Sequence, residues 1–327
     1  MLDHIRVVPL AAESLGVRSM CTYVETPDAR ILLDAGISLC PNRFGLPPHP
    51  QEFRAIADCR RRIAEFAAKC EVVTLSHYHF DHHTPSYEDR LSQWTEATET
   101  ARQIYEGKLV LIKNPRESIN SSQRRRGWLF QVTGGRYARK IEIADSRTFT
   151  FNDTRIKFSR PVFHGPEDSA LGWVLMTTIE CHGEKFMFAP DVQGPISTST
   201  LEIIMNENPA VLLLGGPPTY LAGFKMDERQ IKTGFENLQE LAGHIPTIVL
   251  EHHILRDENW EEKSTGVFYR AFEAEHTIVT AARFLGLPDS FLEAQRKKLF
   301  KADPPSKEFE KWVKMSSEAK RLTEPPI

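Results

Sequence analysis

The sequence predicts an α+β protein in which two β-sheets lie face to face with helices on the outside. Two stretches, residues 5–34 and 140–190, contain short apolar runs separated by turn-forming residues, which indicates β-strands. Segments with helical spacing of apolar residues follow each stretch. Polar residues of the kind that bind metals stand directly after several of the apolar runs. The sequence therefore predicts two halves, each with strands followed by helices, and candidate metal ligands at the ends of several strands.

In the first half, three strands precede a proline-rich loop and a helix. We expect strands at residues 5–11, 20–25 and 30–34, the last two joined by the turn Thr26-Pro27-Asp28. Four prolines between positions 41 and 50 exclude regular structure from the next loop. A helix over 51–69, a buried strand over 72–75, a helix over 87–105 and a strand over 109–112 complete this half.

The second half again has strands followed by helices. The expected strands cover residues 140–144, 149–152, 155–162, 172–180, 185–190, 210–214 and 247–250, and the expected helices cover 226–241 and 267–285. Gly286 and Pro288 end the last helix. The predicted organisation is one domain over residues 1–287 and a charged C-terminal tail over 288–327 that forms a peripheral helix.

The composition is that of an ordinary globular protein. Of 327 residues, 41% are hydrophobic and 26% are charged, which is enough for a sizeable core. The net charge of −3 gives no overall field that attracts nucleic acid or membranes. No apolar stretch reaches the roughly 20 residues that span a bilayer. Five scattered cysteines without a CxxC pair indicate reduced thiols, so we expect a cytoplasmic protein with no membrane partner.

The most informative stretch is residues 75–83, LSHYHFDHH, which follows an expected strand. His77, His79, Asp81 and His82 form the pattern HxHxDH. In an extended loop, side chains two residues apart point the same way, so His77 and His79 can converge on one cation while Asp81 and His82 face a neighbouring one. Imidazole and carboxylate groups are ligands for zinc, iron and manganese. The alternatives are a solvated histidine-rich loop or a structural zinc site, which would usually contain cysteine.

Three later positions share this context, a candidate ligand directly after a strand. They are His164, Asp191 and the pair His252-His253. A lone histidine such as His164 is more often a satisfied core residue than a ligand. The repetition of such strand-end residues along one chain nevertheless favours a shared metal site.

This order of HxHxDH, His, Asp and His resembles the metallo-β-lactamase superfamily of metal-dependent hydrolases. The resemblance covers roughly residues 1–287 and implies a four-layer αββα sandwich of two mixed sheets, with the metals at one edge. It implies a first metal bound by His77, His79 and His164, a second bound by Asp81, His82 and one of the His252/His253 pair, and Asp191 as the bridge. Asp34 matches the superfamily's strand-end aspartate, which supports the histidine loop.

Several flanking stretches resemble, more narrowly, a largely archaeal branch of predicted hydrolases that has no settled substrate. These stretches are residues 13–20, 46–50, 216–221 and 252–257. Glu251 stands where that branch is expected to carry Asp, a departure that leaves the ligand set unchanged. The spacing from His252 to Arg256 resembles that of tRNA-processing members of the superfamily and favours His252 as the ligand. His253 would then face the substrate as a proton donor.

The ligand set implies a hydrolase with two divalent metal ions, with zinc preferred and iron or manganese as other options. Two cations about 3.5–4 Å apart lower the pKa of a bridging water and supply hydroxide near neutral pH. Asp81 can orient that water and accept its proton. Asp81 and His253 are therefore the expected catalytic residues, and the expected bond is an ester or phosphoester.

Two substrate classes stay open, an anionic phosphodiester or nucleic acid and a small ester or lactone. The candidate substrate contacts are Arg18, Tyr220 and Arg256. The run Arg124-Arg125-Arg126 could attract an anionic ligand, on which Trp128 or Phe130 could stack. The alternative for this run is a solvated helix face.

Two other classes of function, redox catalysis and non-catalytic binding, occur on the same fold. A mono-iron enzyme that oxidises thiols uses only two histidines and one aspartate, and the complete second ligand set argues against it. Diiron oxygen-reducing relatives replace the second histidine of the motif, so His79 argues against them. A non-catalytic binding protein typically lacks ligands that are present here. The sequence leaves the oligomeric state open, a homodimer included.

Overall fold

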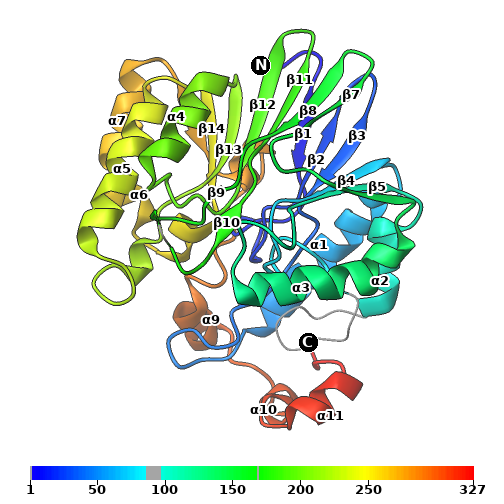
Figure 1. Cartoon of the computed structure of the whole chain (residues 1–327). Coiled ribbons are helices and arrows are strands. Elements are labelled where there is room, and N and C mark those ends of the chain that lie inside the picture. Colours follow the sequence, from blue (N-terminus) through cyan, green and yellow to red (C-terminus); the bar gives the residue numbers. More distant parts are fainter. Residues whose placement is uncertain (1, 86–96, 168) are drawn as a thin grey trace.

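The computed structural model describes residues 2–85, 97–167 and 169–327, and two β-sheets form its centre (Figure 1). The first sheet has six strands in chain order: β1 (Arg6–Pro9), β2 (Thr22–Glu25), β3 (Arg30–Leu33), β4 (Val72–Leu75), β5 (Leu109–Ile112) and β6 (Lys140–Ile143). The first three strands pair antiparallel, and β3 to β6 pair parallel. This sheet is therefore mixed, as expected.

The second sheet is mixed in the same way. Its strands are β7 (Thr148–Phe151), β8 (Thr154–Phe158), β11 (Thr177–Cys181), β12 (Glu184–Ala189), β13 (Val211–Gly215), β14 (Thr247–Glu251) and β15 (Thr277–Val279), in the order 15-14-13-12-11-8-7. Strands β12 to β15 pair parallel and the others antiparallel. The short strands β9 (Val162–Phe163) and β10 (Trp173–Val174) pair separately. Parallel strands end at a common edge of their sheet, which brings the residues after them together.

Helices cover the outer faces of both sheets (Figure 1). The first sheet carries α1 (Pro50–Ala67), α2 (Ala97–Tyr105) and α3 (Ser121–Val132), and the second carries α4 (Thr198–Glu207), α5 (Glu228–Ala242), α6 (Trp260–Lys263) and α7 (Thr265–Glu273). Short 3₁₀ turns are η1 (Gly134–Tyr137), η2 (Thr219–Leu221) and η3 (His252–Arg256).

Alternate residues of the strands fill separate cores, as the pleat requires. On β12, Phe186 and Phe188 join the core between the sheets, while Met187 faces the core under α4 and α5. On β3, Ile31 faces the other sheet and Leu32 the helical side. This four-layer αββα arrangement is the metallo-β-lactamase fold, which confirms the expected fold class.

The expected helix over 267–285 is wrong, because a strand interrupts it. Helix α7 ends at Glu273, and Glu275 takes a positive φ of 58°, which breaks the helix. The β-branched residues of β15 then pair with β14 at the sheet edge, and α8 (Ala281–Phe284) follows. The strands expected over 155–162 and 172–180 are each divided in two by the β9–β10 pair. Of the helix expected over 87–105, residues 87–96 lie outside the described part of the chain.

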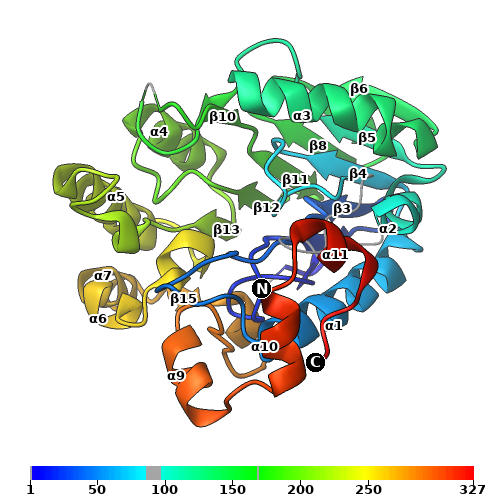
Figure 2. The same ribbon diagram turned by 90° about the horizontal axis from the view of Figure 1, so that it is seen from below.

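The C-terminal segment forms α9 (Arg296–Ala302), α10 (Lys307–Val313) and α11 (Ser317–Leu322). Figure 2 shows α10 beside α1, where the rings of Phe309 and Trp312 lie 5.9 and 5.5 Å from that of Phe53. All five cysteines are free. In the described part of the chain, no helix combines the length and apolar character needed to cross a membrane.

Candidate metal centre

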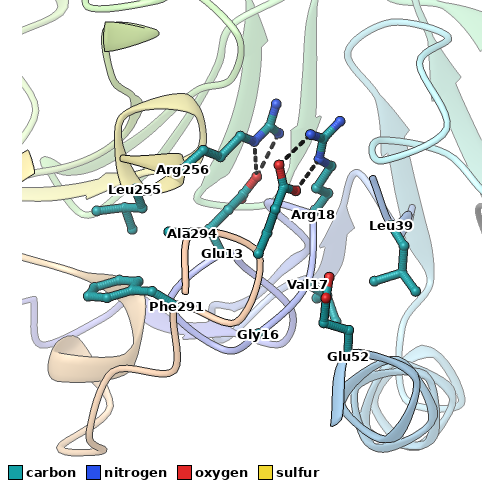
Figure 3. A pocket seen from close by; sticks show the side chains of 11 residues that line it. Glu13, Gly16, Val17, Arg18, Leu39, Glu52, Leu255, Arg256, Phe291 and Ala294 are labelled. Carbon is teal, nitrogen blue, oxygen red and sulfur yellow. Dashed lines mark hydrogen bonds and ion pairs between the residues drawn. The ribbon is translucent and has the colours of Figure 1, made fainter. Parts of the chain in front are cut away.

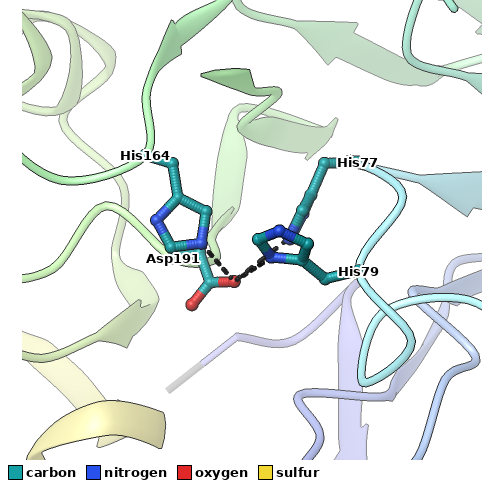
Figure 4. A group of neighbouring side chains, drawn as sticks. All are labelled: His77, His79, His164 and Asp191. Carbon is teal, nitrogen blue, oxygen red and sulfur yellow. Dashed lines mark ion pairs between the residues drawn. The ribbon is translucent and has the colours of Figure 1, made fainter. Parts of the chain in front are cut away.

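The first group of candidate ligands contains three histidines and one aspartate. His77 and His79 come from the loop after β4, His164 directly follows β9, and Asp191 lies in the turn after β12. Asp191 Oδ2 lies 3.1 Å from His77 Nε2, 3.0 Å from His164 Nε2 and 3.9 Å from His79 Nδ1. Figure 4 shows the three rings converging on this carboxylate. One atom of each side chain lies within 4.8 Å of the others, so the four can share one ion.

A second group, Asp81, His82 and His252, lies equally close together. His82 Nε2 is 3.1 Å from Asp191 Oδ2, and His252 Nε2 is 2.9 Å from Asp191 Oδ1. His253 Nε2 is also 3.0 Å from Asp191 Oδ1. Asp191 therefore stands between the two groups. The structure brings together every residue expected as a ligand, and their binding of metal stays a prediction.

Unusual backbone conformations aim these side chains from the strand ends. Asp191, His252 and Asp34 have φ values of 52°, 66° and 48°, in the left-handed region that non-glycine residues seldom adopt. Gly36 allows a close approach, because a Cβ at this position would lie 2.2 Å from the backbone nitrogen of His83. The loop that carries Asp34 can thus pack directly against the HxHxDH segment.

Asp34 orients the histidine loop, as expected. Its carboxylate accepts hydrogen bonds from the backbone N–H of Ser76 (2.8 Å), the Ser76 hydroxyl and His82 Nδ1 (2.8 Å). Ser76 Oγ also lies 2.9 Å from His77 Nδ1. These contacts occupy one ring nitrogen of each histidine and leave Nε2 facing Asp191, an arrangement that is usual around metal sites.

Two further orienting residues were not found by sequence reasoning. Glu13 is buried and places Oε2 3.0 Å from His252 Nδ1 and Oε1 2.8 Å from Arg256 Nε. Gln193 Nε2 lies 3.4 Å from His164 Nδ1. Glu13 is 239 positions from His252, and no spacing or periodicity connects residues so far apart.

The histidines of the two groups differ in their electrostatics: burial opposes protonation in both groups, but Asp191 raises the pKa of His82, and Glu13 raises that of His252 to about 9. Burial lowers the pKa of His77 and of His79, which keeps both imidazoles neutral, as metal ligands must be. Burial opposes ionisation of Asp191, but His164 and His252 hold its pKa well below the ordinary value. Among the described residues, His77 Nε2 and Asp191 Oδ1 are buried atoms that form no hydrogen bond of regular geometry, although each has a polar atom of the cluster about 3 Å away. Buried polar atoms seldom lack partners, and a bound metal ion would supply one.

Two ion pairs lie behind the second group, beside a cavity of about 10 Å³ (Figure 3). Arg256 pairs with Glu13, and Arg18 Nε and Nη2 each lie 2.6 Å from the carboxylate of Glu293. Glutamates already neutralise both cations inside the protein, and the contact of Arg18 and Arg256 with substrate stays a prediction. Tyr220 Oη lies 3.2 Å from Arg256 Nη1, and its contact with substrate stays a prediction.

The Arg124-Arg125-Arg126 run lies on α3 and divides between two faces of the helix. Arg126 Cζ lies 4.5 Å from the centre of the Phe80 ring, and Phe80 belongs to the histidine loop. Phe130 is 2% exposed, so the expectation that it stacks on a ligand is wrong: it belongs to the core. Trp128 is 60% exposed, so its ring is accessible to a ligand.

Comparison with known proteins gives close relatives in archaea. The UPF0282 protein of Methanopyrus kandleri is 41% identical over 295 residues, which cover 90% of this chain and 99% of the relative. The UPF0282 protein of Thermococcus gammatolerans is 44% identical over 300 residues, which cover 91% and 96% of the two chains. No family model matches the chain.

Solved structures that resemble the chain are more distant. Tm1679, a metal-dependent hydrolase of the β-lactamase superfamily, has a TM-score of 0.45 and 14% identity, covering 85% of this chain and 97% of its own. The Zn²⁺-bound PqqB of Methylobacterium extorquens has a TM-score of 0.48 and 13% identity, covering 84% and 97%. Both TM-scores lie below 0.5, so the fold assignment rests on the sheet order and the cores described above.

Proposed function

The chain belongs to the UPF0282 family, and we propose that it is a hydrolase that uses two divalent metal ions. The observation that carries the proposal is Asp191, a buried carboxylate with histidine nitrogens within about 3 Å of each oxygen. Imidazole nitrogens around an ionised carboxylate form the donor set of zinc, iron and manganese sites.

The residues divide between the two ions according to the two groups. His77, His79 and His164 would hold the first ion, Asp81, His82 and His252 the second, and Asp191 would contact both. Zinc is the preferred metal, with iron or manganese as the other options. The complete second group argues against a mono-iron dioxygenase, which needs only three protein ligands.

His252 rather than His253 is assigned to the second ion. His252 Nε2 lies 3.7 Å from Asp81 Oδ2, and its other ring nitrogen is held by Glu13. His253 Nδ1 instead faces Tyr220 Oη at 3.1 Å and Arg256 Nη1 at 3.0 Å. We assign His253 the transfer of a proton to the leaving group, with the Tyr220 hydroxyl beside it.

The open side of the cluster lies at three side chains. His79, Asp81 and His253 are 24%, 17% and 12% exposed, whereas the side chains of His77, His82 and His252 are fully buried. Substrate therefore approaches past these three. Divalent cations bound here would supply a Lewis acid and a source of hydroxide near neutral pH. Asp81 stands at the opening as an acceptor that orients the attacking water and takes its proton.

The proposed substrate is an anionic phosphodiester, with a small ester or lactone as the second class. The basic side chains of α3, next to the histidine loop, favour the phosphodiester. Zinc- or manganese-loaded protein should hydrolyse bis(p-nitrophenyl) phosphate, and His79→Ala should abolish the activity. Cleavage of neither this diester nor generic esters and lactones, by protein that holds its metal, would contradict the proposal.

A further inference from the structure

The outer face of α3 carries a groove of about 420 Å³. Arg116, Arg124, Arg125 and Trp128 line it, together with Ser121 and Gln131. Arg124, Trp128 and Gln131 are spaced four and three residues apart, so they project from one face of the helix. Arg124 Nη2 donates a hydrogen bond to the carbonyl oxygen of Arg116 at 3.2 Å, which holds one guanidinium in place.

The cations of this groove lie in a segment of the sequence that is poor in acids. Residues 113–140 contain eight lysines and arginines and one acid, Glu117, in a chain whose net charge is −3. No carboxylate of the described residues forms an ion pair with Arg116, Arg124 or Arg125. Positive charge is therefore concentrated on this segment, and the rest of the chain is acidic.

The opposite face of α3 packs against the HxHxDH loop. The backbone N–H of Tyr78 donates to Gln123 Oε1 at 3.2 Å, and Arg126 stands over the ring of Phe80. Gly127 allows this contact, because a Cβ there would lie 2.8 Å from the Tyr78 ring. An α-helix is about 10–12 Å across with its side chains, so about one helix diameter separates the groove from the HxHxDH loop.

We propose that this groove binds a single-stranded polynucleotide, with Arg116, Arg124 and Arg125 on the backbone phosphates and a base stacked on Trp128. Guanidinium groups recognise phosphates, and an exposed aromatic ring stacks with any base, so binding is independent of sequence. Delivery of the strand to the metal centre rests on the proposed hydrolase function. Binding in the groove does not.

The test is fluorescence anisotropy of the full-length chain with a fluorescein-labelled 12-nucleotide oligouridylate. Three phosphate contacts on a single strand give a salt slope of about −2, so affinity should fall about 20-fold between 50 and 200 mM salt. Arg124→Ala/Arg125→Ala should weaken binding at 50 mM and reduce the slope to about −0.7. Trp128→Ala should weaken binding about tenfold, and Trp128→Phe should restore most of it.

The matched control is Arg54→Ala/Arg229→Ala, which removes the same charge from exposed positions on α1 and α5. It should bind like the unaltered chain. An equal loss in this control, binding that is insensitive to salt, or no binding at 50 mM salt would each overturn the proposal. Oligouridylate that binds but is never cut would count against the hydrolase and leave the groove standing. Hydrolysis of a small diester without oligouridylate binding would support the hydrolase and overturn the proposed groove.

Discussion

Glu13 is predicted to orient His252 and to neutralise Arg256, and Glu13→Gln tests both roles. The carboxylate lies 3.0 Å from His252 Nδ1 and 2.6 Å from Arg256 Nη2. Partners that orient a metal ligand typically contribute 10- to 100-fold in metal affinity, so we expect the second ion to bind about 30-fold more weakly. Removing the charge also leaves buried Arg256 with Asp81, at 3.7 Å, as its one remaining ion-pair partner among the described residues, which should cost about 3 kcal/mol of unfolding free energy.

The assay is competition for Zn²⁺ with a chromophoric chelator, which resolves two binding events on one chain. In Glu13→Gln the weaker event should move and the tighter event should not, because Glu13 touches no residue of the first group. Urea unfolding of the same samples gives the stability change, and circular dichroism confirms that the variant is folded.

Glu293→Gln is the matched control, since it also removes a buried glutamate from an arginine pair. Glu293 contacts Arg18 and none of the clustered histidines. It should lose comparable stability while both Zn²⁺ affinities stay within about twofold. Unchanged affinities in Glu13→Gln, or an equal weakening in Glu293→Gln, would refute the orienting role.

Three other changes have outcomes that follow from the contacts. Burial opposes ionisation of Glu293, but Arg18 lowers its pKa from 4.5 to about 2. The ionised Glu293 carboxylate therefore stabilises the folded chain by about 3 kcal/mol above about pH 4.5, and this stabilisation is lost as the pH falls towards 2. The unfolding free energy of Glu293→Gln, measured in urea, should lack this pH-dependent contribution. Asp34→Asn should weaken metal binding about 10- to 100-fold in the same chelator competition, because His82 Nδ1 loses a charged acceptor. His253→Gln should lower kcat about 100-fold with two ions still bound, and equal activity would exclude His253 as the proton donor.

The local part of the site could be predicted from sequence. HxHxDH is a contiguous pattern, and each remaining candidate ligand directly follows an apolar run that reads as a strand. Parallel strands such as β12 and β14 end at one edge, so Asp191 and His252 had to approach each other once the sheets were placed.

The rest depended on packing between distant segments. Glu13 contacts His252 across 239 positions, and Arg18 contacts Glu293 across 275. No local sequence pattern could therefore indicate that Arg18 and Arg256 point into the protein. Strand β15 was missed because helical spacing continues through it, and only pairing with β14 makes it a strand. Phe130 could not be distinguished from Trp128 before the face of α3 that packs inward was known.

The most direct test of the central claim is the metal content of the chain. Mass spectrometry of purified, metal-loaded protein after removal of excess ions should give about two ions per chain, as a dinuclear site requires. His79→Ala and His82→Ala, one from each group, should each reduce the content to about one. Fewer than one ion per chain, or a content that neither substitution changes, would contradict the assignment of these side chains as a metal centre.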